Sequence, residues 1–388
     1  MKRYKIFIRT LLILFTTLVT LHFLPLIYVD PLNILPFDIS KNTFYLREMR
    51  FQAAGLINRT DIDSAIVGSS MAANFDAREA GEKLGGNFLN LSPDGSLLKE
   101  REVILRYFLE KRSVKNLIIS LDGISQVQRN KGIPLNLWSY LYNDYRIDDL
   151  KVYTNRKYYP FVSCHPDIRA ILPKNFFGKC RKGRIRESMF DLTAWQPNPY
   201  HHLRFGGIDN WLDNKNNNQI KRAVRDLIEA ADKVIAGKTD EIESDIDPAE
   251  FTRTIIPLAR AYPDTRFLLF FPPYMIYDYA IDAQTAPLIF AGYKQMVAEV
   301  VAASEGLENI ELYWFADQPF VKDIRNYKDL THYHADFNSY FIDEFKRKGS
   351  QINESNYQQL IDQLDRDAQS ADLVGMADNF RNQVDTRF

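Results

Sequence analysis

Two serines near the start of this chain have the residue types and the sequence context of a nucleophilic site. Gly68, Ser69 and Ser70 directly follow a short apolar run over residues 65–67. A buried strand that feeds a small-residue turn presents a reactive group at the carboxyl edge of an α/β sheet. Main-chain N–H groups at such a turn favour developing negative charge. A hydroxyl there becomes a nucleophile when a base reaches it, although a plain strand–helix turn has the same composition.

The matching base stands near the other end of the chain. Asp329 and His332 form an Asp-x-x-His pair ahead of a segment with helical spacing. An imidazole that takes a proton from serine needs an acceptor that fixes its tautomer, and an aspartate three residues earlier can fold back to supply it. His334 is a rival base, but residues two apart do not share a helix face. The pattern predicts Ser70 as nucleophile, His332 as general base and then acid, and Asp329 as orienting carboxylate.

Each of these residues also has a structural interpretation. Ser70 can be a helix N-cap, His332 a hydrogen-bonded structural histidine, and Asp329 a cap or a surface charge. The catalytic interpretation depends on all three meeting in one α/β fold.

Together these blocks resemble those of the SGNH/GDSL hydrolase superfamily. Its nucleophile closes a Gly-Asp-Ser block after the first strand, which Ser70 matches, while Ser69 replaces the usual aspartate and is a weaker alternative nucleophile. Its Asp-x-x-His block matches Asp329 and His332. The Gly-Ser-Ser form followed by Asn-Phe-Asp is similar to a membrane-anchored branch that includes teichoic-acid D-alanyl transfer proteins and relatives of polysaccharide O-acetyltransferases.

An acyl-transfer site also needs donors directed at the developing oxyanion. The resemblance implies the N–H groups of Ser70 and of a glycine after the second strand, for which Gly95 is the best match; the alternative is an ordinary turn glycine. The family's third donor is an Asn after the third strand, but Leu121, Asp122 and Gly123 stand there instead. An ionised Asp122 would repel an oxyanion. Either Asp122 binds a substrate hydroxyl or cationic group, or two donors suffice.

Short apolar strands alternate with amphipathic helices on both sides of a long interruption. Strands are predicted at 65–67, 88–91, 116–121, 265–271 and 310–315, and helices at 44–57, 77–84, 101–112, 219–235, 251–261, 287–303 and 335–348. This alternation is typical of a parallel sheet covered on both faces. We predict a three-layer α/β/α domain, SGNH- or flavodoxin-like, over residues 62–348, with five parallel strands. The resemblance covers residues 62–123 and 251–348.

The interruption over residues 124–247 is predicted to be an insertion after the third strand, a natural place for a lid or a partner surface. It contains Cys164 and Cys180, the two cysteines of the chain. Outside the cytoplasm such a pair favours a disulfide, and two unpaired buried thiols are the alternative. No zinc-type spacing or phosphate loop is present, so we expect neither a metal nor a cofactor. The polar extension 349–388 either packs on the surface or extends freely.

The amino-terminal sequence has the pattern of a membrane anchor. Four basic residues precede an apolar run over residues 10–29, which is about the length of a hydrocarbon core. Asp30 and Asp38 follow it, so the amino end is predicted to lie in the cytoplasm and the rest in the periplasm or outside the cell. A cleaved signal peptide is the alternative, but no small-x-small cleavage site is present. Residues 1–30 are thus predicted as tip and anchor, and residues 31–61 as a juxtamembrane connector.

Charge and family resemblance together define the expected function. With 49 basic and 50 acidic side chains in 388 residues, the chain has no global attraction for nucleic acid. The resemblance implies acyl transfer to a cell-envelope polysaccharide or related polymer through a Ser-His-Asp acyl-enzyme, with the acyl donor supplied by a multispanning membrane acyltransferase. One alternative is a carbohydrate O-acyl esterase of the same fold. Another is a non-catalytic binding or assembly factor for polymer export, which the missing Asn favours.

Overall fold

A five-stranded sheet in which every strand pair is parallel forms the centre of the fold. The computed structural model describes residues 2–36, 45–46, 48–122, 134–145, 147–173, 176, 178–179, 205–214, 216–241 and 247–387. The strand order is β2-β1-β3-β4-β5, with the bounds β1 (Ser64–Val67), β2 (Phe88–Asn90), β3 (Asn116–Ser120), β4 (Arg266–Phe271) and β5 (Ile310–Trp314). The predicted α/β class and parallel five-stranded sheet are confirmed.

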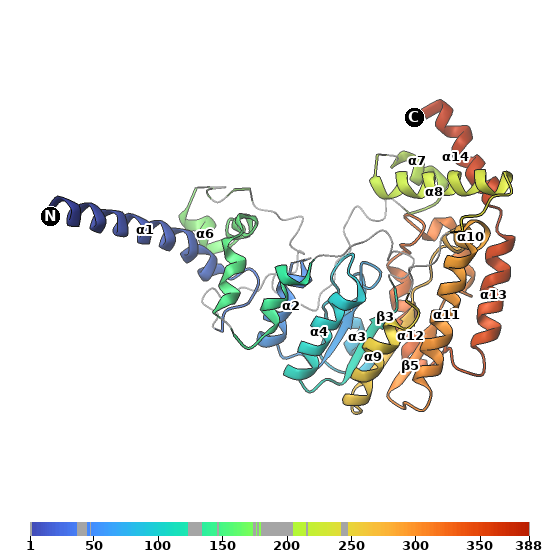
Figure 1. Ribbon diagram of the computed structural model, residues 1–388, viewed down its shortest axis with the longest axis horizontal. Helices are drawn as coiled ribbons and strands as arrows, with labels where there is room; N and C mark the ends of the chain where they lie inside the picture. Colours follow the sequence, from blue (N-terminus) through green and yellow to red (C-terminus); the bar gives the residue numbers. More distant parts are fainter. Residues whose placement is uncertain are drawn as a thin grey trace. The chain divides into compact units, whose positions relative to one another are not determined.

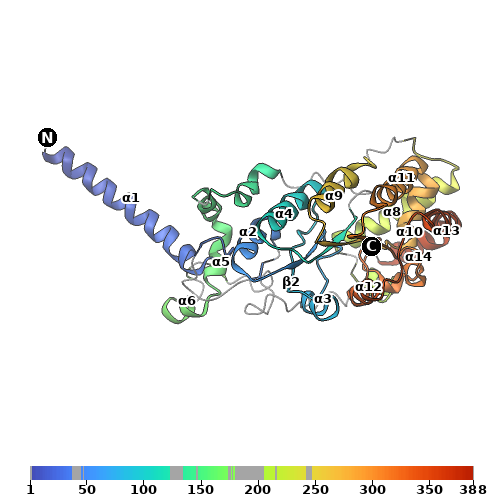
Figure 2. The same cartoon turned by 90° about the horizontal axis from the view of Figure 1, so that it is seen from below.

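Helices cover both faces of this sheet because its strands are apolar on both sides, and nearly every strand residue is buried. One face carries α4 (Leu98–Lys111), α9 (Glu250–Ala261) and α11 (Pro287–Ser304). The other carries α3 (Ala77–Leu84) and α12 (Asp336–Arg347), and Figure 2 shows the two layers on opposite sides of the strands. The strand order reverses between β1 and β3, and in open α/β sheets ligands bind at such a point, at the carboxyl ends of the strands.

The described chain divides into two compact units. Unit 1 combines Met1–Asp61 with Pro134–Leu192, and unit 2 combines Ile62–Ile133 with Thr193–Phe388. The predicted insertion is therefore shared: its first part folds with the amino-terminal segment, and its second part folds with the sheet.

The described part of unit 1 is mostly helical. It contains α1 (Lys2–Val29), α2 (Met49–Arg59), α5 (Tyr159–Val162) and α6 (Pro166–Ile171), joined by 3₁₀ turns at Leu135–Leu137, Ser139–Tyr142, Asp148–Thr154 and Arg156–Tyr158. Within the described chain, α1 is long and apolar enough over Arg3–Val29 to cross a membrane. Cys164 is buried in this unit, whereas Cys180 lies outside the described residues, so the disulfide stays a prediction.

The remaining helices of unit 2 form a cluster beside the sheet. They are α7 (Ile208–Asp213), α8 (Asn218–Ile235), α10 (Ile276–Thr285), α13 (Tyr357–Ser370) and α14 (Leu373–Arg387), with 3₁₀ turns at Pro319–Lys322 and Ile324–Asn326. α10 was not expected from the sequence. α14 packs on α8, and α13 packs on α10, as Figure 1 shows. The carboxyl-terminal extension thus packs on the domain, with Leu364 and Phe380 buried.

Most element bounds shift by a few residues from the sequence-based expectation. α4 begins at Leu98, three residues before the predicted start, because the Glu100 carboxylate accepts the Leu97 N–H at 2.7 Å and caps the first turn. Gly123 and Asp38, which entered the sequence-based predictions, lie outside the described residues.

Candidate active site

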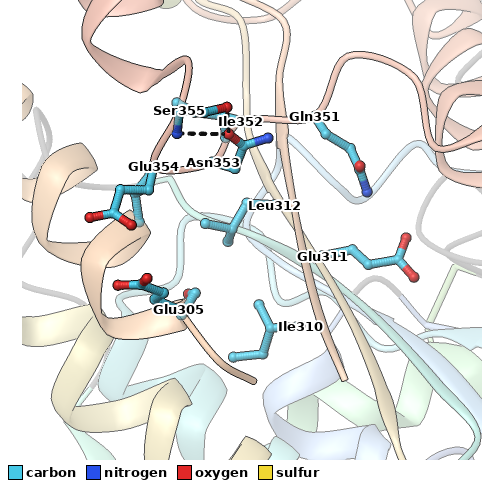
Figure 3. Close-up of a pocket in the computed structure, with 11 residues that line it drawn as sticks. Glu305, Ile310, Glu311, Leu312, Gln351, Ile352, Asn353, Glu354 and Ser355 are labelled. Carbon is cyan, nitrogen blue, oxygen red and sulfur yellow. Dashed lines mark hydrogen bonds between the residues drawn. The ribbon is translucent and has the colours of Figure 1, made fainter. Parts of the chain in front are cut away.

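The two ends of the sheet differ in what they offer for chemistry. A pocket of about 520 Å³ lies at the amino end of β5, between the end of α11 and residues 351–355 (Figure 3). Its lining includes Glu305, Glu311 and Glu354, but Glu311 is already paired with Arg266 at 2.7 Å. Catalytic side chains in parallel sheets stand at the carboxyl ends of strands, and the predicted nucleophile lies at that opposite end.

Close packing sets the shape of the turn after β1. A Cβ on Gly68 would lie 2.2 Å from Ser120 Oγ and 2.5 Å from Ala72 Cβ, so only glycine fits there. The Gly68 N–H donates to Ser92 Oγ at 3.0 Å, and Ser96 Oγ donates to the Gly68 carbonyl at 3.3 Å. The loop after β2, which contains Gly95, is therefore bonded directly to the turn that carries Ser70.

Ser70 lies in a tight turn and does not cap a helix. The Ser69 carbonyl accepts the N–H groups of Ala72 and Ala73 at 3.2 and 3.1 Å. α3 begins only at Ala77, and its N-cap is Asp76, whose carboxylate accepts two main-chain N–H groups. Among the described residues, the Ser70 N–H has no hydrogen-bond acceptor.

The loop that carries Asp329 and His332 is braced by main-chain bonds. Tyr327 and Tyr333 pair as an antiparallel bridge, and the Lys328 N–H donates to the His332 carbonyl at 3.1 Å. The Met275 N–H donates to the Leu330 carbonyl at 3.0 Å and ties the loop to the segment that follows β4. The loop thus presents Asp329 and His332 from a hydrogen-bonded hairpin.

Within this hairpin the aspartate holds the imidazole. His332 Nδ1 lies 2.9 Å from Asp329 Oδ1 and 3.0 Å from Oδ2, and Oδ1 also accepts the His332 N–H at 2.8 Å. Burial alone would raise the pKa of Asp329. The charge of His332, its hydrogen bonds and the charge of Lys328 outweigh burial and hold that pKa well below its ordinary value. The carboxylate therefore stays ionised and can stabilise an imidazolium.

The structure brings the three predicted residues together. Ser70 Oγ lies 2.8 Å from His332 Nε2, across 262 positions of sequence. Tyr333 adds a second link between the two segments, because its hydroxyl donates to the Met71 carbonyl at 2.8 Å. The imidazole of His332 is within hydrogen-bond reach of the Ser70 hydroxyl on one side and of the Asp329 carboxylate on the other, which is the arrangement that serine-based acyl transfer requires.

No protein-family model, curated protein or solved structure matches this chain. The resemblance to the SGNH/GDSL superfamily rests on the Gly-Ser-Ser and Asp-x-x-His blocks of the sequence.

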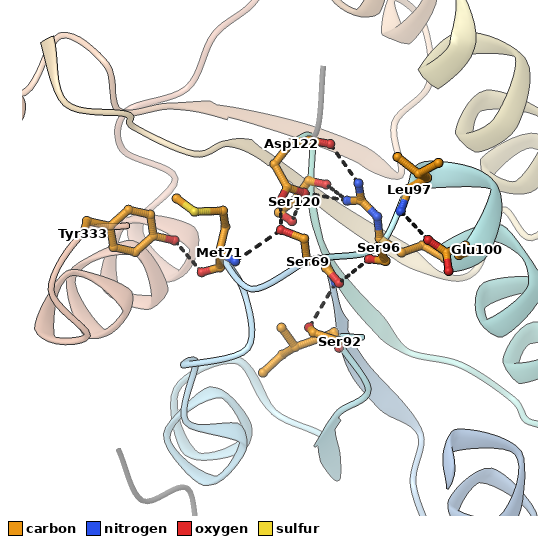
Figure 4. Close-up of polar contacts among 12 residues, drawn as sticks. Ser69, Met71, Ser92, Ser96, Leu97, Glu100, Ser120, Asp122 and Tyr333 are labelled. Atoms are coloured by element: carbon orange, nitrogen blue, oxygen red, sulfur yellow. Dashed lines mark hydrogen bonds and ion pairs between the residues drawn. The ribbon is translucent and has the colours of Figure 1, made fainter. Parts of the chain in front are cut away.

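Asp122 takes part in a buried network beside the nucleophile turn (Figure 4). Arg101 Nη1 donates to Asp122 Oδ1 at 2.6 Å, and Ser120 Oγ donates to the same oxygen at 2.7 Å. Ser69 Oγ donates to Oδ2. Arg101 and Asp122 are both buried, so the ion pair compensates two charges that would otherwise be very costly.

This network gives the Asp122 carboxylate structural partners at the end of β3. Three donors already occupy the Asp122 carboxylate, so contact with a substrate through these oxygens would require breaking the network. Arg101 was predicted only as the first residue of an amphipathic helix, and no sequence signal marks it as buried. The roles of Asp122 and Gly95 toward a ligand stay predictions.

The second part of the insertion supports the Asp-x-x-His hairpin, which the sequence did not indicate. Trp211 of α7 is buried, and its Nε1–H donates to the Tyr327 carbonyl at 2.9 Å. The Gly206 N–H donates to the Arg325 carbonyl at 2.9 Å. The ring of Phe205 packs edge-on against His334 at 4.7 Å between centroids, and in the described contacts His334 does not bond Ser70.

No group of three or more His, Cys, Asp or Glu side chains in the described part of the chain is arranged to hold a metal ion.

Proposed function

We propose that the protein is a membrane-anchored serine acyltransferase that acts on a cell-envelope polysaccharide or related polymer through an acyl-enzyme. The observation that supports this most directly is the 2.8 Å separation of Ser70 Oγ and His332 Nε2, with Asp329 at 2.9 Å behind the imidazole. Nucleophile, base and orienting group in this geometry are the general signature of covalent acyl transfer.

The proposed reaction has two halves that share one intermediate. Ser70 Oγ attacks the acyl carbon of the donor ester while His332 Nε2 takes the hydroxyl proton. The donor alcohol then leaves with that proton, and the acyl group stays on Ser70. In the second half an acceptor hydroxyl gives its proton to His332 and attacks the acyl-enzyme, and Ser70 regains a proton as it leaves.

The negative charge on the tetrahedral intermediate needs hydrogen-bond donors that do not already bond another group of the protein. The Ser70 N–H meets this requirement among the described residues, and the loop of Gly95 is bonded to the same turn. In this proposal the Arg101–Asp122 pair stabilises the turn from behind and does not face the intermediate, so the hole relies on main-chain groups.

The amino-terminal helix favours transfer over hydrolysis. α1 is apolar over Arg3–Val29, and the basic residues before it favour a cytoplasmic amino end, which would place the site outside the cytoplasm. Burial of Leu26 and Val29 within unit 1 supports a retained anchor. An enzyme held at a membrane stands beside donors delivered by a multispanning acyltransferase, whereas hydrolysis needs only water.

Labelling of the full chain with a fluorophosphonate probe tests the catalytic proposal. We expect one covalent adduct on Ser70, none in Ser70→Ala, and normal labelling in Ser355→Ala, an exposed serine that lines the pocket at the other end of the sheet. A folded wild-type chain that takes up no probe would favour the non-catalytic binding or assembly factor, as would unchanged polymer acylation in cells that carry Ser70→Ala.

A second assay separates transferase from esterase. The purified full chain would be given an acetyl ester with and without an oligosaccharide acceptor. Ester cleavage that accelerates with acceptor and yields acylated oligosaccharide supports transfer. Rapid hydrolysis that is indifferent to the acceptor would establish the esterase alternative.

A further inference from the structure

Unit 1 exposes apolar side chains close to the point where α1 ends. Ile171, the last residue of α6, is 78% exposed, and Phe176 is 63% exposed. Pro173 between them is also exposed, and Leu172 is half-buried. Two large exposed apolar side chains this close together in sequence are suited to contact with an apolar surface.

Direct contacts attach this segment to the carboxyl end of α1. The Tyr28 hydroxyl donates to Asp167 of α6 at 2.6 Å, and the Tyr28 ring packs edge-on against His165 at 5.6 Å. One helix earlier, the Tyr159 hydroxyl lies 2.7 Å from His22 Nδ1. Both views place α6 beside the last third of α1, at the end of unit 1 from which α1 projects (Figures 1 and 2).

The surface of α1 shows where its apolar exposure ends. Large apolar side chains are exposed along the helix as far as Leu24, which is 59% exposed, whereas Leu26 is fully buried by unit 1. Tyr28 is four residues beyond Leu24, or about 6 Å along the helix axis at 1.5 Å per residue. The residue that holds α6 is therefore about one helical turn from the last position of α1 that faces outward as an apolar anchor.

We propose that Ile171 and Phe176 insert into the interfacial layer of the same bilayer that α1 spans. The occupant is a lipid surface because the patch begins at the last residue of α6, and α6 is bonded to α1 just beyond the exposed apolar stretch of that helix. Exposed Arg169 and Lys179 stand on either side of Ile171 and Phe176 in the sequence, and their side chains are suited to lipid phosphates. The segment is a second membrane contact that fixes unit 1 against rotation about α1.

This proposal rests on α1 spanning a bilayer and is independent of the catalytic proposal. The test uses the full chain in nanodiscs of phosphatidylcholine and phosphatidylglycerol, with acyl chains brominated near the headgroup or unbrominated. Bromine quenches tryptophan only within the bilayer. We expect Ile171→Trp and Phe176→Trp each to add fluorescence that brominated lipid removes.

Ile147→Trp is the matched control, because Ile147 lies in the same unit, is 72% exposed and precedes Asp148 and Asp149. Its added fluorescence should not respond to bromine. Leu21→Trp, on the exposed part of α1 and nearer its carboxyl end, should be quenched strongly. If Leu21→Trp is quenched and positions 171 and 176 are not, the proposal is overturned; if Leu21→Trp is not quenched, its premise is wrong.

A measurement on the unaltered chain guards against a variant that misfolds. Lipids with a photoactivatable diazirine near the headgroup should form adducts within residues 166–179 in nanodiscs. Adducts on α1 alone would overturn the proposal, as would adducts on residues 144–149 at the same yield.

Discussion

At the scale of single residues, the hydroxyl of Ser69 connects the nucleophile turn to a buried ion pair. Ser69 Oγ donates to Asp122 and accepts the Met71 N–H at 3.3 Å. The Ser69 hydroxyl therefore ties the residue that follows Ser70 to the buried carboxylate after β3. Arg101 pairs with the Asp122 carboxylate and holds it in place. We propose that the two adjacent serines have different roles: Ser69 positions the turn, and Ser70 is the nucleophile.

Ser69→Ala tests this division. The change removes two hydrogen bonds, each worth about 0.5–1.5 kcal/mol, so we expect labelling of Ser70 by a fluorophosphonate to slow by about tenfold or more. The melting temperature should change little, because the Arg101–Asp122 pair remains. Ser120→Ala is the matched control, since it removes a bond to the same carboxylate without touching the turn residues Ser69 and Met71. Equal labelling rates in both variants would contradict a positioning role for Ser69.

At the scale of elements, α7 supports the hairpin that carries the base. The Nε1–H of Trp211 in α7 donates to the Tyr327 carbonyl. Tyr327 pairs with Tyr333, and the Tyr333 hydroxyl donates to the Met71 carbonyl in the nucleophile turn. A chain of direct contacts therefore runs from the insertion to Ser70. Each contact is short-ranged, but together they limit how far His332 can move from Ser70.

Trp211→Phe should loosen this hairpin. The change keeps an aromatic ring in the buried site but leaves the Tyr327 carbonyl without its donor, which costs about 1–3 kcal/mol. We expect a lower melting temperature and a slower reaction of Ser70 with the probe. Trp314→Phe is the control, because the Trp314 Nε1 is buried without a described partner and no bond is lost. A Trp211→Phe variant that melts earlier but reacts at the normal rate would show that α7 is merely structural.

The junction after α1 contains a buried carboxylate that should make unit 1 sensitive to pH. Burial raises the pKa of Asp30 to about 6, although the Tyr153 hydroxyl, two main-chain N–H groups and Arg59 favour its charged form. Between the ordinary carboxyl pKa of about 4 and this value, folded unit 1 holds a proton that the unfolded chain has released. Its free energy of unfolding should therefore fall as the pH rises through this window.

Asp30→Asn should flatten this dependence. The shift of about two pKa units corresponds to a loss on the order of 3 kcal/mol between about pH 4 and pH 7. Urea unfolding of the full chain in detergent, followed at both pH values, measures it. Asp144→Asn, which changes an exposed carboxylate of the same unit, should leave the pH dependence intact. A wild-type protein that gains stability over this pH range would contradict the predicted sign. If Asp30→Asn and Asp144→Asn show the same pH dependence of stability, Asp30 is not the responsible group.

At the scale of the whole molecule, the anchor is also part of a core. Leu26, Val29 and Leu32 are buried in unit 1, and a Cβ on Gly55 of α2 would lie 2.3 Å from the Leu32 carbonyl oxygen. The carboxyl end of α1 and the segment after it therefore cannot be removed without opening unit 1, whereas the exposed first two thirds of α1 contribute nothing to that core.

Two truncations test this difference. Removal of residues 1–36 deletes at least three buried apolar side chains, each worth about 1.5–3 kcal/mol, and should make residues 134–173 sensitive to limited proteolysis. Removal of residues 1–18 should leave them resistant. In both truncated chains residues 64–122 should stay protected, because they belong to unit 2. Equal protection of residues 134–173 in the two chains would show that α1 is only an anchor.

The sequence by itself determined the parts of this protein that depend on near neighbours along the chain. Apolar runs such as residues 267–271 predict buried strands, and the length of α1 is visible in its hydropathy. The bounds of α3 are those that the sequence predicts. Capping, periodicity and turn chemistry act over a few residues, so a linear pattern contains them.

Only the tertiary structure decided which distant residues meet. Ser70 and His332 are 262 positions apart and face each other only because β1 is an interior strand of the sheet and the hairpin after β5 folds back over the carboxyl edge of that sheet. The burial of Arg101 against Asp122 and the division of the insertion between two units are likewise long-range outcomes. The sequence around a helical arginine is the same whether its guanidinium lies in water or in a buried ion pair. The carboxylate that determines which of the two occurs lies on another element.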